Sequence, residues 1–159
     1  MPFPFSLSGT LEIHSPEETG LPAIAAAVAD AIRNAEARSL TVTPEMIAFH
    51  AGMFRSVNNL NPLISITNGQ IRFSQRGDLV LIHYRITFLQ TLAFDALFTG
   101  FMFGFVAGAS YYIIALGWLV LAIVNLAQAN RRFPRLLRTA AEKGRDDAVA
   151  AIAASTNAE

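Results

Sequence analysis

Between Ile86 and Asn130 the chain carries a single formally charged side chain, Asp95. This apolar run is about 45 residues long, whereas one helix needs only about 20 residues to cross a bilayer. Two spans are therefore the natural interpretation, with helices expected at about 87–107 and 111–130 and a turn within the small-residue stretch 107–110. The alternative, a soluble protein with two unusually apolar core helices, is disfavoured by the length of the run.

Basic side chains flank this run on both sides, and the expected turn between the two helices has none. They are Arg72, Arg76 and Arg85 before it, and Arg131, Arg132, Arg135 and Arg138 after it. By the positive-inside rule this pattern predicts a multi-pass protein of a bacterial-type inner (plasma) membrane with both termini cytoplasmic. The first residues lack the basic and apolar regions of a signal peptide, so the segment before the hairpin is expected to stay in the cytoplasm.

Small residues recur every fourth position in the first expected span, at Ala96, Gly100, Gly104 and Gly108. At this spacing they form one stripe along a helix. Small residues let membrane helices approach closely, so the stripe predicts helix packing. The packing is expected either within the hairpin or against a second protomer or a partner's helix, because this spacing does not specify the partner.

Asp95 lies beside that stripe, on a short polar face with Thr91 and Thr99. Folding the hairpin about residues 109–110 places Asn125 at nearly the same depth, so we predict an Asp95–Asn125 hydrogen bond. An ionisable residue inside a membrane is by default a candidate for function. Two roles stay open: a polar clasp or partner contact, and an ion or proton pathway in an oligomer.

Residues 1–86 have the pattern of an α+β domain. Apolar residues alternate over 5–13, which predicts a half-buried strand, and Ser15, Pro16 and Glu18 form a helix-start signal. A helix is expected at about 21–37, followed by short strands at 40–43 and 47–51. The expected fold is an antiparallel sheet of about five to six strands with one packed helix, in the order β-α-β-β-β-β-β.

Two turn signals, Asn68–Gly69 and Arg76–Gly77, predict two consecutive hairpins. Pairing outward from both turns places six apolar side chains on one face: Ile64, Ile66, Ile71, Phe73, Val80 and Ile82. In detail, Phe73 is expected opposite Val80, and Ile71 opposite Ile82. A slip of one residue would break this agreement.

The opposite face of the same strands is polar and basic, with Ser65, Thr67, Gln70, Arg72, Leu81, His83 and Arg85. The last strand, at about 79–87, runs almost directly into the first expected span, which should hold the sheet close to the bilayer. Arg72 and Arg85 are therefore candidate contacts for lipid headgroups, the alternative being a merely solvated face. The Asn-rich loop 55–63 is a possible ligand-binding segment, although turn chemistry explains its composition equally well.

Residues 131–159 are expected to form a basic juxtamembrane helix and tail. Phe133, Leu136, Leu137, Ala140 and Ala141 follow a helical apolar spacing with arginines between them. This pattern is typical of an amphipathic helix on the anionic inner leaflet of the membrane. Arg131, Arg132, Arg135 and Arg138 are then candidate headgroup contacts; the alternative is that they only set the topology.

No pattern singles out catalytic residues, a cofactor or a metal site. The chain has no cysteine, its three histidines are isolated, and it has no glycine-rich phosphate loop. Its net charge of zero points to no nucleic-acid partner. We expect a non-enzymatic membrane protein whose hairpin anchors a small domain for partner binding, as an accessory subunit or homo-oligomer. The alternatives are an oligomeric ion, proton or small-solute transport component using Asp95, and a membrane-attached lipid- or small-ligand-binding domain.

Overall fold

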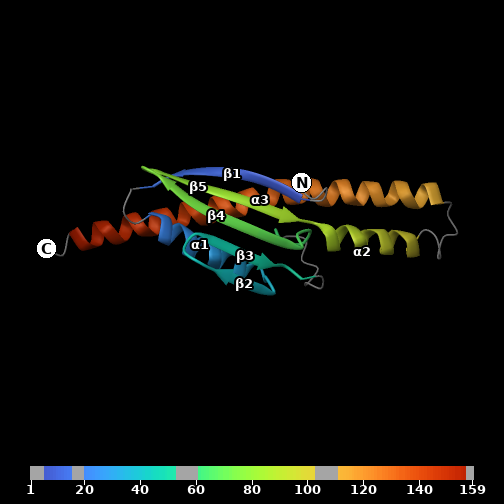
Figure 1. Cartoon of the computed structure of the whole chain (residues 1–159), viewed down its shortest axis with the longest axis horizontal. Coiled ribbons are helices and arrows are strands. Elements are labelled where there is room, and N and C mark those ends of the chain that lie inside the picture. The colour runs from blue at the N-terminus through green and yellow to red at the C-terminus, as the bar shows by residue number, and fades with distance from the viewer. Residues whose placement is uncertain (1–5, 16–19, 53–60, 103–110, 157–159) are drawn as a thin grey trace.

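The computed structural model describes residues 6–15, 20–52, 61–102 and 111–156. Its elements are β1 (Ser6–His14), α1 (Gly20–Asn34), β2 (Ser39–Val42), β3 (Met46–His50), β4 (Asn68–Arg76), β5 (Leu79–Thr87), α2 (Leu89–Thr99) and α3 (Tyr111–Thr156). The five strands form one antiparallel sheet in the order β1-β5-β4-β3-β2 (Figure 1). The predicted α+β class with an antiparallel sheet is confirmed. The helix-start residues Pro16 and Glu18 and most of the loop 55–63 lie outside the described residues.

The β4–β5 hairpin forms as predicted, but its turn consists of Gly77 and Asp78. Phe73 therefore faces Ile82 instead of Val80, and the pairing is shifted by two residues along β5. Side chains alternate with a period of two, so this shift keeps each of them on its expected face. Gly77 has a φ of 63°, which suits the first central position of a type II′ turn.

The other predicted turn, Asn68–Gly69, is wrong. These two residues begin β4, where Asn68 pairs with both His50 and Thr87. Residues 62–65 are turns, so the strand expected before Asn68 is not formed and the sheet has five strands. Gly69 is needed here because the ring of Phe49 packs directly against its backbone: a Cβ atom at this position would lie 2.1 Å from that ring.

Two helices cover one face of the sheet, where the sequence predicted one. α1 contributes Ile24, Val28 and Ile32 to the core, and the C-terminal half of α3 contributes Phe133 and Leu137; all five are fully buried. α1 and this half of α3 lie along the same side of the sheet (Figure 1). None of the described helices covers the other face of the sheet, which we call the open face.

Phe133 joins α3 to the centre of the sheet. Its ring centroid lies 5.4 Å from that of Tyr84 and 5.9 Å from that of Phe49. Tyr84 covers Gly9 on β1 in the same way that Phe49 covers Gly69, so two glycines make room for two aromatic rings. Burial raises the pKa of the Tyr84 phenol above its ordinary value.

The apolar face of residues 133–141 therefore belongs to the protein core. Phe133, Leu137, Ala140 and Ala141 are buried against the sheet and α1. The expectation that this face rests on lipid is wrong, because an amphipathic spacing fits a protein core as well as a membrane surface. The exposed arginines lie on the outer side of the same helix.

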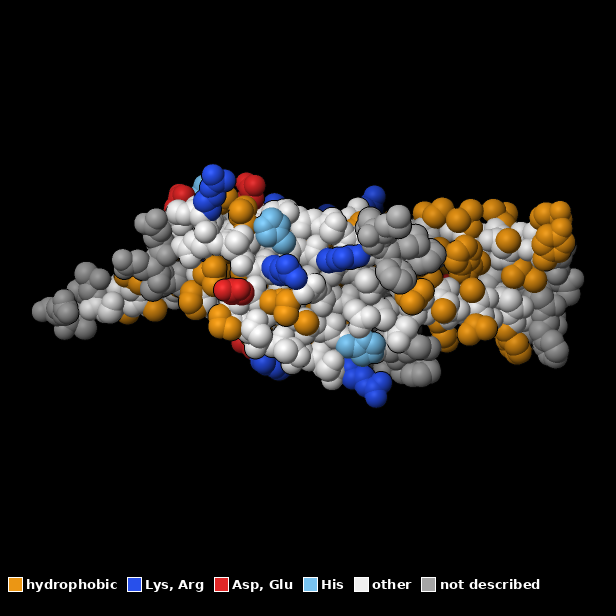
Figure 2. All heavy atoms as spheres, in the orientation of Figure 1, with side chains coloured by type: hydrophobic (Ala, Val, Ile, Leu, Met, Phe, Trp, Pro, Cys, Tyr) orange, Lys and Arg blue, Asp and Glu red, His pale blue; other side chains and the backbone are white. Residues whose placement is uncertain are grey.

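α3 is continuous from Tyr111 to Thr156, which corresponds to a length of about 69 Å at 1.5 Å per residue. Its first half lies beside α2, and together they extend from one end of the sheet (Figure 1). Figure 2 shows apolar side chains gathered over this extension, where Leu97, Tyr111 and Leu116 are among the exposed residues. We call it the apolar rod: α2 and the part of α3 before Arg131.

α3 is the one helix among the described residues that is long and apolar enough to cross a membrane. α2 has 11 residues, and a span needs about 20. The two-helix transmembrane hairpin expected from the sequence is therefore not shown. The residues between the two helices, 103–110, lie outside the described part of the chain.

Candidate functional site

The open face of the sheet brings polar side chains from three strands into two adjacent rows. The first row runs across β1, β5 and β4 through Thr10, His83 and Arg72. The second row, one step closer to the apolar rod, runs through Ser8, Arg85 and Gln70. The alternation of each strand sets this arrangement, since the residues between them, such as Tyr84 and Ile71, point into the core.

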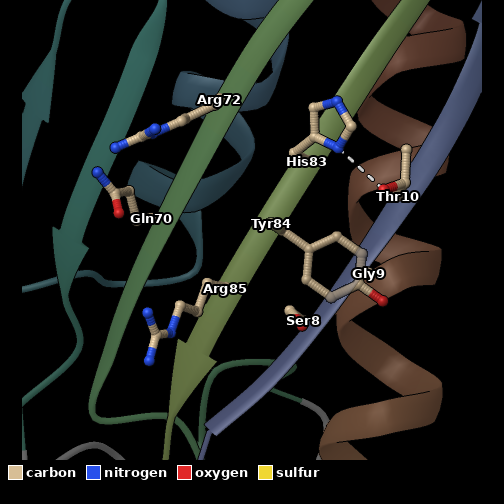
Figure 3. Close-up of a pocket in the computed structure, with 8 residues that line it drawn as sticks. All are labelled: Ser8, Gly9, Thr10, Gln70, Arg72, His83, Tyr84 and Arg85. Atoms are coloured by element: carbon tan, nitrogen blue, oxygen red, sulfur yellow. Dashed lines mark hydrogen bonds between the residues drawn. The ribbon is translucent and has the colours of Figure 1, made fainter. Parts of the chain in front are cut away.

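The two rows surround a shallow hollow of about 450 Å³ (Figure 3). Its lining is Ser8, Gly9, Thr10, Gln70, Arg72, His83, Tyr84 and Arg85. Thr10 Oγ1 lies 2.9 Å from His83 Nδ1, which fixes one side of the hollow. On the other side, Gln70 Nε2 donates to the sulfur atom of Met46 at 2.7 Å.

The charge of this hollow is positive. Arg72 and Arg85 are both exposed, and neither forms an ion pair within the described residues. The described ion pairs, which include Arg33–Asp30, lie elsewhere on the molecule. Among all the residues that the structure describes, no group of three or more His, Asp or Glu side chains is placed to hold a metal ion. The site is therefore suited to an anion.

A second polar region lies where the sheet meets the apolar rod. Asn125 Nδ2 of α3 donates to Asp95 Oδ2 of α2 at 2.7 Å. Ser65 Oγ, from the turn before β4, donates to Asn125 Oδ1 at 3.3 Å. The structure thus brings together Asp95 and Asn125, which the sequence predicted to lie at the same depth. It adds Ser65, which the sequence did not indicate.

The turn before β4 is bonded to α2 as well. Thr91 Oγ1 donates to the backbone oxygen of Ser65 at 3.1 Å, and the backbone N–H of Gln90 donates to Thr67 Oγ1 at 3.1 Å. Ser65 and Thr67 are buried in this contact, although the sequence placed them on the outer face of the sheet. We call these residues, together with Asp95 and Asn125, the junction. Its hydrogen bonds tie the rod to the sheet.

The described part of the small-residue stripe does not pack against α3. Ala96 is exposed, and a Cβ atom at Gly100 would meet no heavy atom within 4 Å. Gly104 and Gly108 lie outside the described residues. Gly100 thus has no close neighbour among the described residues, and the packing of the stripe stays a prediction.

The six candidate headgroup residues fall into two groups. Arg72 and Arg85 line the hollow on the open sheet face. Arg131, Arg132, Arg135 and Arg138 lie along α3, in the helical layer on the other side of the sheet. Ser8 and Thr10 were not predicted as members of the hollow, because only the long-range pairing of β1 with β5 brings them there.

No known protein family, characterised protein or solved structure matches this chain.

Proposed function

We propose that this chain is a non-enzymatic, multi-pass protein of a bacterial-type inner membrane, in which a helical hairpin anchors a small cytoplasmic domain that binds a partner. It would act as an accessory subunit or as a homo-oligomer. The observation that carries this proposal is the continuity of α3, which passes without a break from an exposed apolar half into the core of the domain. From Tyr111 to Asn130 the helix rises about 30 Å, the thickness of the hydrocarbon layer.

The domain is held firmly against the rod, which suits a module that presents a binding surface at a fixed position. A single residue, Phe88, separates β5 from α2, and it is 2% exposed. α3 forms the second covalent connection, and the junction adds hydrogen bonds between them. A partner bound to the domain would therefore meet it at a constant height above the bilayer.

Asp95 fits a structural role in this proposal. Its carboxylate accepts a hydrogen bond from Asn125, which itself accepts one from Ser65. A buried polar group needs such partners in a membrane, where water does not supply them. The alternative of a transport function would require an oligomer, since one acidic residue on two helices does not form a conduit.

Single-cysteine labelling tests the topology, because the chain has no native cysteine. We expect Ser110→Cys to react with a membrane-impermeant maleimide in intact spheroplasts. Ser74→Cys on the domain and Ser155→Cys near the C-terminus should react only after permeabilisation. Labelling of Ser110→Cys only after permeabilisation, together with residues 74 and 155, would refute the hairpin.

Affinity purification from native membranes in mild detergent tests the partner. We expect either a co-purifying protein in a defined ratio or a detergent-corrected mass that is a multiple of the 17.2 kDa chain. A monomer with no associated protein would contradict the proposal.

A further inference from the structure

The hollow on the open sheet face is rich in hydrogen-bond donors. Arg72 and Arg85 each offer a planar fork of N–H groups, and Ser8 and Thr10 offer hydroxyl groups. Arginine forks bind phosphate oxygens in pairs, with charge-assisted hydrogen bonds. We propose that this hollow binds the phosphate group of an anionic ligand; its place near the membrane surface rests on the function proposed above.

The two arginines are placed to act on one ligand. Arg72 pairs with His83 and Gln70 pairs with Arg85, so the arginines occupy diagonal positions on neighbouring strands. Diagonal neighbours on one face of a sheet lie within reach of long side chains. Figure 3 shows the two guanidinium groups on either side of Gln70. A phosphate held between them would contact both forks and the amide of Gln70.

The lining favours a hydrated anion over an apolar ligand or a cation. The volume of about 450 Å³ lies within the range of small-molecule sites, but most of the residues that line the hollow are polar or charged. The nearest acidic side chain along β1 is Glu12. It lies two residues after Thr10, on the same face of the sheet and farther from the rod, and it pairs with Leu81. Glu45 is also nearby, because it precedes Met46, the residue opposite Arg72. Within the described residues neither Glu12 nor Glu45 forms an ion pair with either arginine. The charge of the two arginines is thus left for a ligand.

Two sources can supply such a phosphate. Arg85 precedes the start of α2 by four residues, or about 13 Å of extended chain, so its side chain can reach toward lipid headgroups. Arg72 lies one row farther from the rod and its side chain is exposed, so a soluble phosphomonoester can reach it. The phosphate chemistry is the same for both, and the experiment below separates them.

The test uses the full chain in nanodiscs and three double variants. Arg72→Gln with Arg85→Gln removes both forks of the hollow. Arg38→Gln with Arg76→Gln is the matched control, because it removes two exposed arginines that neither line the hollow nor were expected to contact lipid headgroups. Arg72→Lys with Arg85→Lys keeps the charge but removes the fork geometry.

The soluble arm titrates inorganic phosphate and glycerol phosphate into protein in phosphatidylcholine nanodiscs by calorimetry at low salt. The lipid arm counts phosphatidic acid molecules retained by the protein in native mass spectrometry. We expect the glutamine variant of the hollow to weaken binding by about tenfold or more per arginine, as loss of charge-assisted hydrogen bonds predicts. The lysine variant should recover only part of the binding, and the control variant, Arg38→Gln with Arg76→Gln, should bind like the wild type.

Selective loss of binding in the hollow variant supports the proposal. Loss in the soluble arm identifies a free phosphate, and loss in the lipid arm alone identifies a headgroup. No binding by the wild type in either arm overturns the proposal, and so does equal weakening in the hollow variant and the control variant. Arginine-dependent binding of a polyglutamate peptide without phosphate binding overturns it in favour of an acidic protein partner.

Failure of this inference is distinguishable from failure of the proposed function. Alkaline carbonate extraction of the wild type reports membrane integration without any phosphate ligand. A chain that stays in the membrane but binds no phosphate refutes the inference alone. A chain that carbonate removes from the membrane refutes the anchored-domain proposal, whatever the phosphate titration gives.

Discussion

Replacing Gly144 by alanine should destabilise the domain, although the same change stabilises most helices. A Cβ atom at this position would lie 2.8 Å from the backbone oxygen of Ala23, 2.8 Å from the Cβ of Ala27 and 3.0 Å from the Cα of Ile24. Two of these three atoms belong to the backbone of α1, so no side-chain rotation relieves the contact. α1 would have to move away from α3, which would disturb the layer that covers the sheet.

The size of the effect follows from two opposing terms. Alanine is favoured over glycine inside a helix by about 1 kcal/mol. Overpacking a filled interior costs about 1–3 kcal/mol, and contact with backbone atoms places this site in the upper half of that range. We expect Gly144→Ala to lower the free energy of unfolding by about 1–2 kcal/mol. Gly144→Leu should lower it further.

Urea denaturation in mild detergent, followed by far-UV circular dichroism, gives this free energy. Hydrogen exchange of α1 peptides should report the same loss locally, because α1 is the helix displaced. Gly100→Ala is the control: its Cβ atom would enter open space, so stability should not fall. A rise of about 1 kcal/mol for Gly144→Ala, as an exposed helical glycine would give, would refute the close contact between α1 and α3.

Three further predictions concern the core and the junction. Phe133→Ala should cost about 3–5 kcal/mol in the same urea assay, since the ring is fully buried between two aromatic rings, whereas the exposed Arg135→Ala should change stability little. Asn125→Leu should lower the thermal stability of the detergent-solubilised protein, because it leaves the Asp95 carboxylate without its hydrogen-bond donor, while Asp95→Asn should be tolerated. If vesicles with Asp95→Asn lose ion flux while assembly stays intact, that result would instead support transport. Burial raises the pKa of Tyr84, so the unfolded chain loses this proton first and stability should fall as the pH rises above about 10. Tyr84→Phe should flatten that pH dependence in urea titrations, and an unchanged slope would contradict the assignment.

The sheet could be predicted from local patterns because alternation records which face of a strand is buried. Ile71, Phe73, Val80 and Ile82 all lie on the predicted buried face, even though the turn is displaced. The prediction of a turn at Asn68–Gly69 is wrong because Gly69 has another role. It leaves room for the ring of Phe49, a residue distant in sequence. A glycine required for packing and a glycine required for a turn look identical in one sequence.

The role of α3 could not be predicted from its own residues. An apolar stripe such as Phe133, Leu137 and Ala141 indicates that a helix face is covered, but not whether lipid or protein covers it. The same limit applies to the hollow. The alternation of the strands placed Arg72, His83 and Arg85 on one face. Ser8 and Thr10 join them only because β1, the first strand, pairs with β5, the last. Long-range pairing of this kind leaves no local signal.

The path of α3 also sets the order in which the protein can be made. All five strands and α1 precede the apolar rod in the chain, whereas Phe133 and Leu137, which complete their core, follow it. During synthesis the rings of Phe49 and Tyr84 therefore stay without their contact to Phe133 until the apolar rod has left the ribosome. In the proposed topology, insertion into the membrane becomes a step in folding the cytoplasmic domain, and a chain stopped before residue 131 leaves that domain without one wall of its core.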